Sequence, residues 1–199
     1  LLRDRLVFPI CDTQGRVLAF GGRALGDVQP KYLNSPDSAF YSKRMHLYGI
    51  HLARGPISRG DQAVLVEGYF DVVSLHQAGF PRAVASLGTA LTPEQANLLH
   101  RYTRTAVLAY DSDPAGQQAT LKGAEILEEA GLRVLVATMP EGEDPDSLAR
   151  KNPEALTEQI AAAVGVVEFQ MDCLQRRIDL STPEGKEDFV REVLPSIGR

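Results

Sequence analysis

Short apolar runs near the start of the chain predict a hairpin. Residues 6–10 and 16–20 are apolar, and residues 11–15 between them have turn chemistry, which is typical of two antiparallel strands. Residues 26–44 are rich in Pro, Asn, Ser, Lys and Tyr without clear periodicity, so we expect a structured loop on a working surface. A short helix over residues 46–53 would end before the Gly-Pro pair that follows.

From residue 60 onward, apolar runs alternate with segments of helical length. The expected strands are residues 63–66, 83–86, 106–110 and 133–137, and the expected helices between them are residues 70–78, 92–102 and 115–130. Such alternation predicts right-handed crossovers and a parallel sheet that is covered by helices. After Pro145, apolar positions at helical spacing over residues 153–178 and 183–194 predict a helical segment.

The patterns together predict an α/β fold class with a central parallel sheet covered by helices. A basic α+β lobe over residues 1–59 would precede a central domain over residues 60–150, and a helical part over residues 151–199 would follow. No apolar run approaches the roughly 18 residues of a membrane span, so no membrane partner is expected. The chain begins at Leu1 without an initiator Met or signal-peptide features. We interpret it as a fragment of a longer protein, with the cytoplasm as the default location.

Charge is divided unevenly along the chain. Residues 1–59 hold nine Lys and Arg against four Asp and Glu, a net of +5, whereas the remainder holds twelve against twenty-two, a net of −10. A basic lobe beside an acidic one suits an enzyme that handles polyanions with a divalent metal, although charge can also vary between lobes without function. Cys11 and Cys173 lie far apart without metal-ligand spacing, so we expect two reduced thiols and no zinc site in this chain.

Acidic residues follow three of the expected strands. Glu67 and Asp71 come after the first strand, Asp111 and Asp113 after the third, and the cluster 141–146, which includes Asp144 and Asp146, after the fourth. Because ligands of open α/β sheets bind beyond the carboxyl ends of the strands, these carboxylates should converge at one edge. Converging carboxylates repel one another unless a cation joins them, and hard oxygen ligands suit Mg²⁺ or Mn²⁺.

Each acidic cluster also has an ordinary structural explanation. Asp113 precedes a proline and a helix, so it could be a helix cap, and residues 141–146 could be a solvated loop. Residues 86–89, after the second strand, could hold a phosphate on backbone N–H groups or form an ordinary turn. Only the combination at three strand ends favours a metal site.

The motifs resemble the Toprim family, which includes bacterial primases, type IA and II topoisomerases and some nucleases. A Glu at the end of the first strand and an Asp-x-Asp at a later one carry the family likeness, here Glu67 and Asp111-Ser112-Asp113. The finer resemblance is to bacterial DNA primases and covers about residues 5–150. Its motifs are residues 66–73, 83–89, 110–116 and 142–146, together with residues 8–10, 20–23, 31–36, 43 and 47–49 of the basic lobe. Ser112 stands where this family usually has Gly.

The resemblance implies nucleotidyl transfer that makes RNA primers on single-stranded DNA from ribonucleoside triphosphates. Glu67 would be the general acid or base, or a further metal ligand. Mg²⁺ or Mn²⁺ would be held by Asp111, Asp113, Asp144 and Asp146, with Asp71 as another ligand or a residue that supports the ligands. Nucleic acid or nucleotide would contact Arg23, Lys31, Tyr32, Asn34 and Lys43, while Tyr32 and Tyr41 stack on bases or merely pack. The resemblance also implies a zinc-binding domain, and contacts to a replicative helicase and a single-strand-binding protein, in regions outside this chain.

Two alternatives remain from the residues alone. The first is a Toprim nuclease or a fragment of a topoisomerase, whose nucleophilic Tyr would lie in another domain; the lobe that holds residues 31–36 argues against it. The second is a non-catalytic Toprim module that binds DNA. Formation of RNA from ribonucleotides distinguishes the primase from both.

Overall fold

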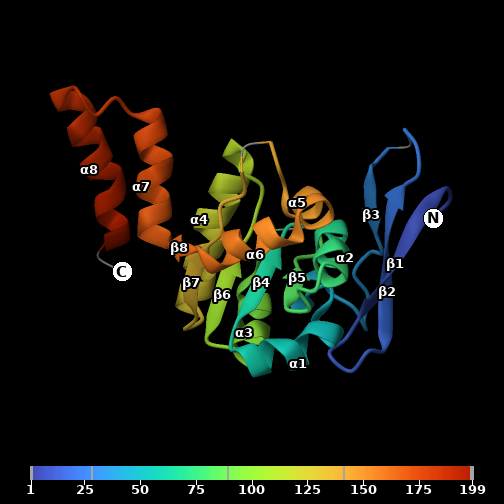
Figure 1. The fold of residues 1–199 in the computed structure, drawn as a ribbon. Helices are drawn as coiled ribbons and strands as arrows, with labels where there is room; N and C mark the ends of the chain where they lie inside the picture. The colour runs from blue at the N-terminus through green and yellow to red at the C-terminus, as the bar shows by residue number, and fades with distance from the viewer. Residues whose placement is uncertain (1, 28, 89, 141, 198–199) are drawn as a thin grey trace.

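The computed structural model describes residues 2–27, 29–88, 90–140 and 142–197, which form two separate sheets (Figure 1). The smaller sheet has the order β1 (Arg5–Cys11), β2 (Val17–Ala24) and β3 (Tyr32–Asn34), with antiparallel neighbours. The predicted hairpin is therefore confirmed. β3 lies in the segment expected as a loop, because Tyr32–Asn34 pairs with Gly21–Arg23 of β2. A strand of three residues is too short to show a period in the sequence.

The larger sheet holds the order β5 (Ala83–Ala85), β4 (Ala63–Val66), β6 (Thr105–Leu108), β7 (Arg133–Val136) and β8 (Val164–Gly165). Its first four strands are parallel, at the four positions that the apolar runs predict. The α/β fold class is confirmed. The sheet is not purely parallel, since β8 pairs with β7 in the antiparallel direction at the edge.

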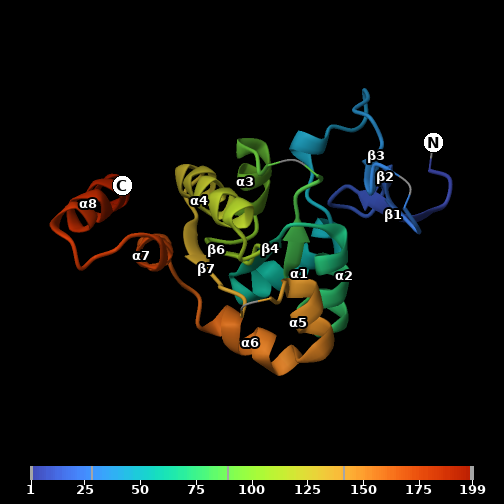
Figure 2. The same cartoon turned by 90° about the horizontal axis from the view of Figure 1, so that it is seen from above.

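Helices cover both faces of this sheet, and α3 and α4 lie opposite α5 and α6 in Figure 2. The helices are α1 (Ile50–Gly60), α2 (Tyr69–Gln77), α3 (Pro93–His100), α4 (Pro114–Glu129), α5 (Pro145–Lys151), α6 (Pro153–Ala161), α7 (Val166–Arg177) and α8 (Pro183–Ile197), besides a 3₁₀ turn at Lys43–Met45. Alternate strand residues divide between two apolar clusters. Leu65 and Leu108 pack with α1, α3 and α4, whereas Val64 and Val107 pack with α2, α5 and α6, as expected of strands buried on both faces.

Two helix predictions are wrong in their bounds. α1 runs to Gly60 with Pro56 inside it, although the expected helix ended before that proline. The lost backbone hydrogen bond is tolerated because Ile50, Ala53 and Ile57 bury one side of the helix completely. The continuous helical pattern over residues 153–178 is interrupted by β8, and Gly165 caps α7. Periodicity does not reveal a two-residue strand whose position depends on pairing with β7.

The smaller sheet packs against the end of the larger one through aromatic rings. Phe8 of β1 lies 5.3 Å from Tyr69 between ring centroids, in a cluster with Ile10, Tyr41 and Leu87. Gly21 of β2 is required here, because a Cβ would stand 2.7 Å from the Tyr69 ring. The contact fixes the inner face of the small sheet beside the carboxyl ends of β4 and β5.

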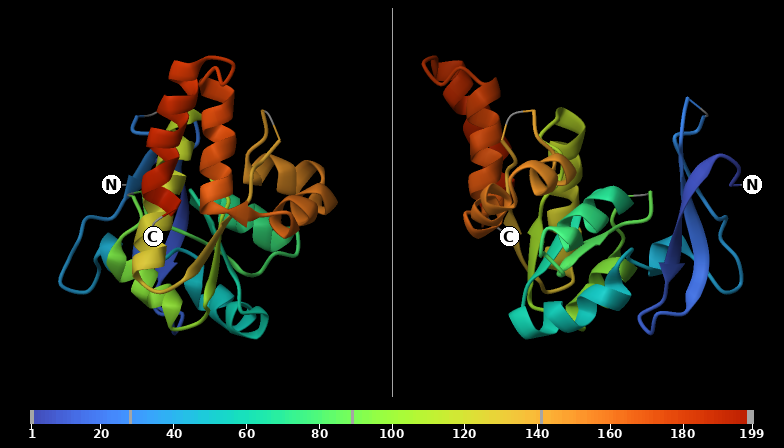
Figure 3. Two further views of the ribbon diagram at one scale, coloured as in Figure 1. Left: turned by 90° about the vertical axis from the view of Figure 1, so that its left-hand side faces the viewer. Right: turned by 45° about the vertical axis from the view of Figure 1, so that its right-hand side comes forward.

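At the opposite end of the molecule, α7 and α8 form an antiparallel pair that projects from the sheet (Figures 1 and 3). α7 also contacts α4 and β7, whereas the contacts of α8 are mainly with α7. Among the described helices, none is long and apolar enough to cross a bilayer. The domain boundaries at residues 59 and 150 remain a prediction.

Candidate active site

The acidic residues and the basic lobe meet at one cavity of about 400 Å³ beyond the strand ends. Most of the residues singled out in the sequence line it, namely Glu67, Asp71, Asp111, Asp144 and Asp146 on the acidic side and Arg23, Lys31, Tyr32 and Asn34 on the basic side. Residues separated by more than a hundred positions therefore come together as expected from the convergence of strand ends. Asp113 lines a smaller neighbouring hollow with Asp111 and Asp144.

Backbone groups orient the innermost carboxylates. Glu67, which directly follows β4, accepts a hydrogen bond from the Asp111 N–H at 3.1 Å, so the ends of β4 and β6 are joined. Asp71, in the first turn of α2, accepts a hydrogen bond from the Gly68 N–H at 2.8 Å. A carboxylate at a helix start is favoured by the helix dipole. Each carboxylate keeps a second oxygen for another partner.

Burial and mutual repulsion raise the pKa of two carboxyl groups. The pKa of Asp71 rises to about 7, mainly because the group is buried and further because Asp111, Asp144 and Asp146 are negatively charged. The pKa of Asp111 rises to about 6, first through burial and then through Glu67, Asp144 and Asp113. Both groups therefore lack a compensating cation among the described side chains. Perturbed carboxyls in a cavity are typical of functional sites.

The other carboxylates at this edge already have partners. Asp113 caps α4 by accepting the Gly116 N–H at 2.7 Å, and Asp144 caps α5 by accepting the Ser147 N–H at 2.6 Å. Asp146 pairs with Arg150 at 2.6 Å and accepts the Ser74 hydroxyl. The capping interpretation of Asp113 is therefore confirmed, and capping still leaves one oxygen of each side chain available. Glu141 of this cluster lies outside the described residues.

The carboxylates fit a divalent ion that shares its ligands with a substrate. Within the described parts of the chain, no three Asp, Glu, His or Cys side chains stand close enough to hold an ion by themselves. Mg²⁺ in sites for phosphoryl and nucleotidyl transfer usually binds to one or two carboxylates, waters and substrate phosphates. The converging oxygens of Asp111 and Asp144, with the raised pKa of Asp111, suit that arrangement. The metal-ligand roles of Asp71, Asp111, Asp113, Asp144 and Asp146 stay a prediction.

On the basic side, aromatic rings hold the Arg23 guanidinium at the cavity. Its Cζ lies 4.1 Å from the centre of the Phe70 ring and 5.8 Å from that of Tyr32. Lys31 Nζ lies 6.0 Å from the Tyr32 ring, and Tyr32 is 44% exposed. Two cations and an exposed ring at one side of the cavity suit phosphates and bases. The sequence did not indicate that Phe70 contacts a site residue. Its position beside Asp71 at the start of a helix was the only sign of such a role.

Three residues chosen from the sequence make contacts that differ from their expected roles. Asn34 donates a hydrogen bond from Nδ2 to the Leu87 carbonyl at 2.9 Å and accepts one from the Tyr69 hydroxyl, so it ties the small sheet to the large one. Lys43 lies in the 3₁₀ turn, where its carbonyl accepts from Gln95 at 2.9 Å; it does not line the cavity. Tyr41 is 2% exposed and stacks on His46, which confirms packing.

The turn after β5 lies at the same edge. Ser86 and Gly88 line the cavity, and Gly88 has a φ of 71°, a conformation that favours glycine. A Cβ there would also approach Asn34 Nδ2 to 3.0 Å. Thr89, the last residue of the suggested phosphate-binding turn, lies outside the described residues, so that role is not tested.

Three family models match successive parts of this chain. The Toprim-like model matches residues 64–149, the N-terminal domain of the DNA primase catalytic core matches residues 1–54, and the DnaB-helicase binding domain of primase matches residues 167–199. The last match corrects the expectation that the helicase-binding region lies entirely outside this chain. Its helices carry no catalytic motif by which the sequence could have indicated it.

Relatives and solved structures agree with these matches. A DNA primase of Clostridium acetobutylicum is 44% identical over 96% of this chain and 32% of its own length. The zinc-binding and RNA polymerase domains of the Aquifex aeolicus primase superpose with a TM-score of 0.84 at 37% identity, over 98% of this chain and 47% of that one. A DnaG primase catalytic domain bound to single-stranded DNA gives 0.81 at 40% identity, over 98% and 64%.

The fold and the acidic strand ends define the class as a Toprim-like protein. Within that class, the small basic sheet and the end-to-end likeness to primase catalytic cores place the chain in the bacterial DNA primase family. The chain spans about a third of the length of the curated relatives that it matches.

Proposed function

We propose that this chain forms the catalytic centre of a DNA-directed RNA polymerase that makes short RNA primers on single-stranded DNA during replication. The observation that carries the proposal is the single cavity that joins uncompensated carboxylates to the cations Arg23 and Lys31. A nucleotidyl transferase needs both, since it must hold polyanionic substrates and neutralise charge on the transferred phosphorus. The cytoplasm remains the expected location.

The reaction joins the 3′-hydroxyl of a primer to the α-phosphorus of a ribonucleoside triphosphate. A new P–O bond forms, the bond between the α-phosphorus and the bridging oxygen to the β-phosphate breaks, and pyrophosphate leaves. Glu67, at the end of β4, would accept the hydroxyl proton or pass it to water. Its hydrogen bond with the Asp111 N–H at 3.1 Å holds it in the cavity.

The residues that would hold Mg²⁺ or Mn²⁺ are Asp111 and Asp144 in the first place, with Asp71, Asp113 and Asp146 around them. When bound, the ion would lower the pKa of the attacking hydroxyl and neutralise charge on the leaving group. Without it, the raised pKa of Asp71 and Asp111 reflects burial first and repulsion between carboxylates second, and a cation would relieve the repulsion.

The basic side of the cavity would contact the template or the triphosphate. Arg23 and Lys31 reach it from β2 and the turn before β3, and Tyr32 offers an exposed ring for a base. Asn34 would act by positioning, since its side-chain amide already joins the two sheets.

A replicative helicase would bind to the α7 and α8 pair and to further parts of the full protein. The zinc-binding domain and the site for single-strand-binding protein would lie outside this chain.

A ribonucleotide incorporation assay tests the proposal. The protein is incubated with circular single-stranded DNA, Mg²⁺ and labelled ribonucleoside triphosphates, both as this chain and within a chimera in which it replaces the matching third of the Escherichia coli primase. We expect an RNA product that ribonuclease digests and that does not form when the metal is chelated. Cleavage of the DNA without RNA would indicate a Toprim nuclease or topoisomerase. DNA binding without either reaction would indicate a non-catalytic module.

A pair of lysine variants tests the basic side. Lys31→Ala should weaken single-stranded DNA binding for all sequences, because a phosphate contact carries no base information, and should reduce the log–log salt slope by about 0.7. Lys43→Ala removes the same charge from a position that does not line the cavity. Equal losses in both variants would show that long-range charge, and not this cavity, determines DNA binding.

A further inference from the structure

The four parallel strands begin at the end of the large sheet that is opposite to the carboxylates, and this end carries positive charge. Four segments lead into or begin β4, β5, β6 and β7 there, namely residues 59–62, 80–82, 100–104 and 128–133, and we call them the amino edge. They hold five Arg against three Asp and Glu, a net of +2, whereas the whole chain has a net charge of −5. The arginines are Arg59, Arg82, Arg101, Arg104 and Arg133, and the acidic residues are Asp61, Glu128 and Glu129.

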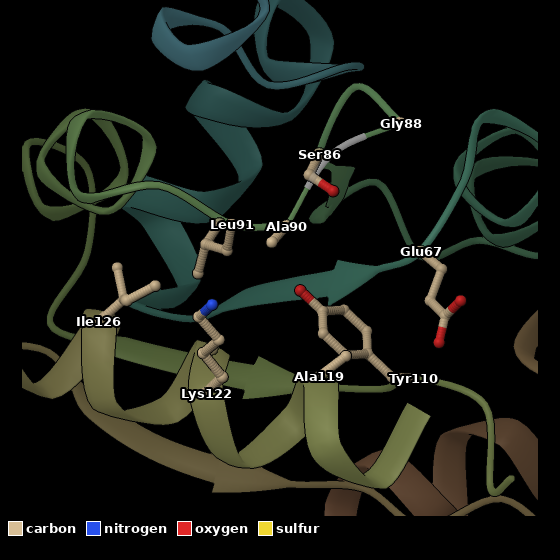
Figure 4. Close-up of a pocket in the computed structure, with 10 residues that line it drawn as sticks. Glu67, Ser86, Gly88, Ala90, Leu91, Tyr110, Ala119, Lys122 and Ile126 are labelled. Carbon is tan, nitrogen blue, oxygen red and sulfur yellow. The ribbon is translucent and has the colours of Figure 1, made fainter. Parts of the chain in front are cut away.

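The amino edge is separate from the cavities at the carboxyl ends of the strands. Figure 4 shows that other end, where Glu67 follows β4 and Lys122 of α4 points into a neighbouring space. The cations that line these cavities are Arg23, Lys31 and Lys122, and no arginine of the amino edge lines either of them. The five arginines therefore do not belong to the candidate active site.

The arginines of the amino edge have no carboxylate partners. None of them forms an ion pair within the described part of the chain, and all except the half-buried Arg82 are exposed. Asp61 serves another purpose, since its Oδ1 accepts hydrogen bonds from the Thr103 hydroxyl at 3.0 Å and from the Arg104 N–H at 2.8 Å. It joins two loops and leaves the guanidinium groups without a counter-charge.

Strand pairing arranges three of the arginines in a row. The sheet order β5, β4, β6, β7 places Arg82 before β5, Arg104 before β6 and Arg133 at the start of β7. The Arg82 carbonyl accepts the Val64 N–H at 3.0 Å, and the Arg104 carbonyl accepts the Arg133 N–H at 2.8 Å. A Cβ at Gly60 would lie 2.8 Å from Arg82 Nη1, so this guanidinium lies beside the end of α1. Neighbouring strands are about 4.8 Å apart, so the row is about 14 Å long.

Helix ends explain only part of this charge. A cation near the C-terminal end of a helix is stabilised by the helix dipole, which accounts for Arg59 at the end of α1 and Arg101 after α3. Arg104 and Arg133 stand instead at the starts of neighbouring strands, where their like charges repel. The Arg104 guanidinium contacts the His100 ring at 3.1 Å, which adds no negative charge. A bound anion would relieve this repulsion.

An anion with several charges along a line fits the row. Each guanidinium offers a fork of N–H groups that matches a phosphate. Among the residues that the structure describes between 54 and 133, no large apolar side chain is exposed. The amino edge therefore lacks the apolar centre of protein interfaces and the aromatic rings that stack on unpaired bases, and phosphates need neither.

We propose that the row of Arg82, Arg104 and Arg133 binds the phosphate backbone of a nucleic-acid strand outside the active site. At a rise of about 3.4 Å per nucleotide in a duplex strand, the row spans about four nucleotides. The strand belongs either to the single-stranded template or to the duplex of primer and template, and the test separates these two sources. The inference goes beyond the proposed function, because it places a second nucleic-acid contact at the opposite end of the sheet.

Fluorescence anisotropy at several NaCl concentrations tests the row. The labelled probes are a DNA single strand and an RNA–DNA duplex of equal length. The double variant Arg104→Gln and Arg133→Gln removes two phosphate contacts, so the log–log salt slope should become shallower by about 1.4 for the single strand or about 1.8 for the duplex. The probe whose slope changes identifies the source. The loss should be equal for different base sequences, since phosphate contacts carry no base information.

The matched control is the double variant Arg177→Gln and Arg191→Gln. It removes two exposed guanidinium charges from α7 and α8, away from the amino edge, and both of its slopes should equal those of the wild type. Arg82→Gln gives an independent variant of the row, with about half the change of the double variant. Thermal unfolding shows whether each variant keeps the fold.

Several results would overturn the inference. They are wild-type slopes in the Arg104 and Arg133 double variant and in Arg82→Gln, equal changes in the double variant and its control, and a wild type that binds neither probe. Loss of polyglutamate binding with unchanged binding of both nucleic acids would assign the row to an acidic protein segment and overturn it as well. In each case, RNA synthesis by the wild type would leave the proposed function standing. The expected slopes in a protein that makes no RNA would support the row while the proposed function fails.

Discussion

Two groups of carboxylates at the same sheet edge differ in how their charge is compensated. Asp71, in the first turn of α2, and Asp111, after β6, lie near other carboxylates, and the pKa of each is raised, to about 7 and about 6. Asp146 and Glu143, in and before α5, pair with Arg150 at 2.6 Å and Lys151 at 2.7 Å. Among the described residues, a basic side chain forms an ion pair with each carboxylate of the second group and with neither carboxylate of the first.

The difference indicates what each group is for. A buried carboxylate with no counter-charge destabilises the fold, so its presence needs a reason outside the folded chain. A cation that binds at the first group would provide that reason. The carboxylates of the second group already have partners, and their ion pairs help to hold α5 in place. Substitutions in the first group should therefore change function more than stability, and substitutions in the second should do the reverse.

The largest effect is expected for Asp111→Asn. The substitution keeps the size of the side chain but removes one charge from the uncompensated group, so primer synthesis should fall below detection while the fold is retained. Mn²⁺ affinity, measured by its electron paramagnetic resonance signal, should fall as well. Wild-type Mn²⁺ affinity in this variant would place the metal elsewhere and remove the functional difference between the two groups.

Glu67→Gln tests whether the first group also transfers protons. Gln retains the acceptor for the Asp111 N–H but has no basic carboxylate, so the rate of nucleotide addition should fall by about 10²–10⁴-fold. Affinity for single-stranded DNA should be unchanged, which separates this variant from Lys31→Ala. If the rate remains at the wild-type level, Glu67 serves only to join β4 to β6.

Much of this site was predictable because it depends on strand ends. Buried parallel strands read as continuous apolar runs, so the positions of Glu67 and Asp111 after such runs fixed their edge and side of the sheet. Asp113 was expected either as a ligand or as a cap, and the structure shows the cap. The ligand role needs a bound ion and cannot follow from either sequence or fold.

Other features depend on contacts between distant segments. Nothing local in the sequence marks Asn34 as the link between two sheets, since its partners are Tyr69 and the Leu87 carbonyl. The strand Val164–Gly165 exists only because it pairs with β7. Lys31 and Lys43 look alike in the sequence, since both are lysines of the basic lobe, yet only Lys31 lines the cavity. Pairing and lining are properties of the assembled fold.

A smaller effect, on stability, is expected for Asp71→Asn. Since the pKa of Asp71 is raised from 3.8 to about 7, the folded protein holds this proton more tightly than the unfolded chain. The free energy of unfolding should therefore decrease as pH rises from about 4 to 7, without divalent ions, and this decrease should be shallower in Asp71→Asn. At pH 8 the variant should be more stable than the wild type by about 0.5–2 kcal/mol.

Urea unfolding at several pH values measures this, with Asp27→Asn as a control because Asp27 is exposed in the loop after β2. The control loses the same charge away from the cavity and should keep the wild-type pH dependence. A variant at Asp71 that is less stable than the wild type at pH 8 would show that the hydrogen bond with Gly68 outweighs repulsion, so that this carboxylate belongs with the compensated group.

The smallest effect is expected in the second group, for Arg150→Ala. Its ion pair with Asp146 joins positions one helical turn apart, and the Arg150 side chain is 64% exposed, so its loss should lower the free energy of unfolding by about 0.2–1 kcal/mol. Arg191→Ala is the control on α8, far from the strand ends, because Arg191 is 67% exposed and pairs with Glu187 at the same spacing, and also with Asp188. Without divalent ions the two losses of stability should be similar.

With Mg²⁺, Arg150→Ala alone should recover stability. The substitution leaves the Asp146 carboxylate unpaired, and this carboxylate lines the cavity with Asp111 and Asp144 and would share the bound cation. Equal responses of both variants to Mg²⁺ in thermal unfolding would mean that Asp146 takes no part in cation binding, and that the boundary between the two groups lies between Asp144 and Asp146.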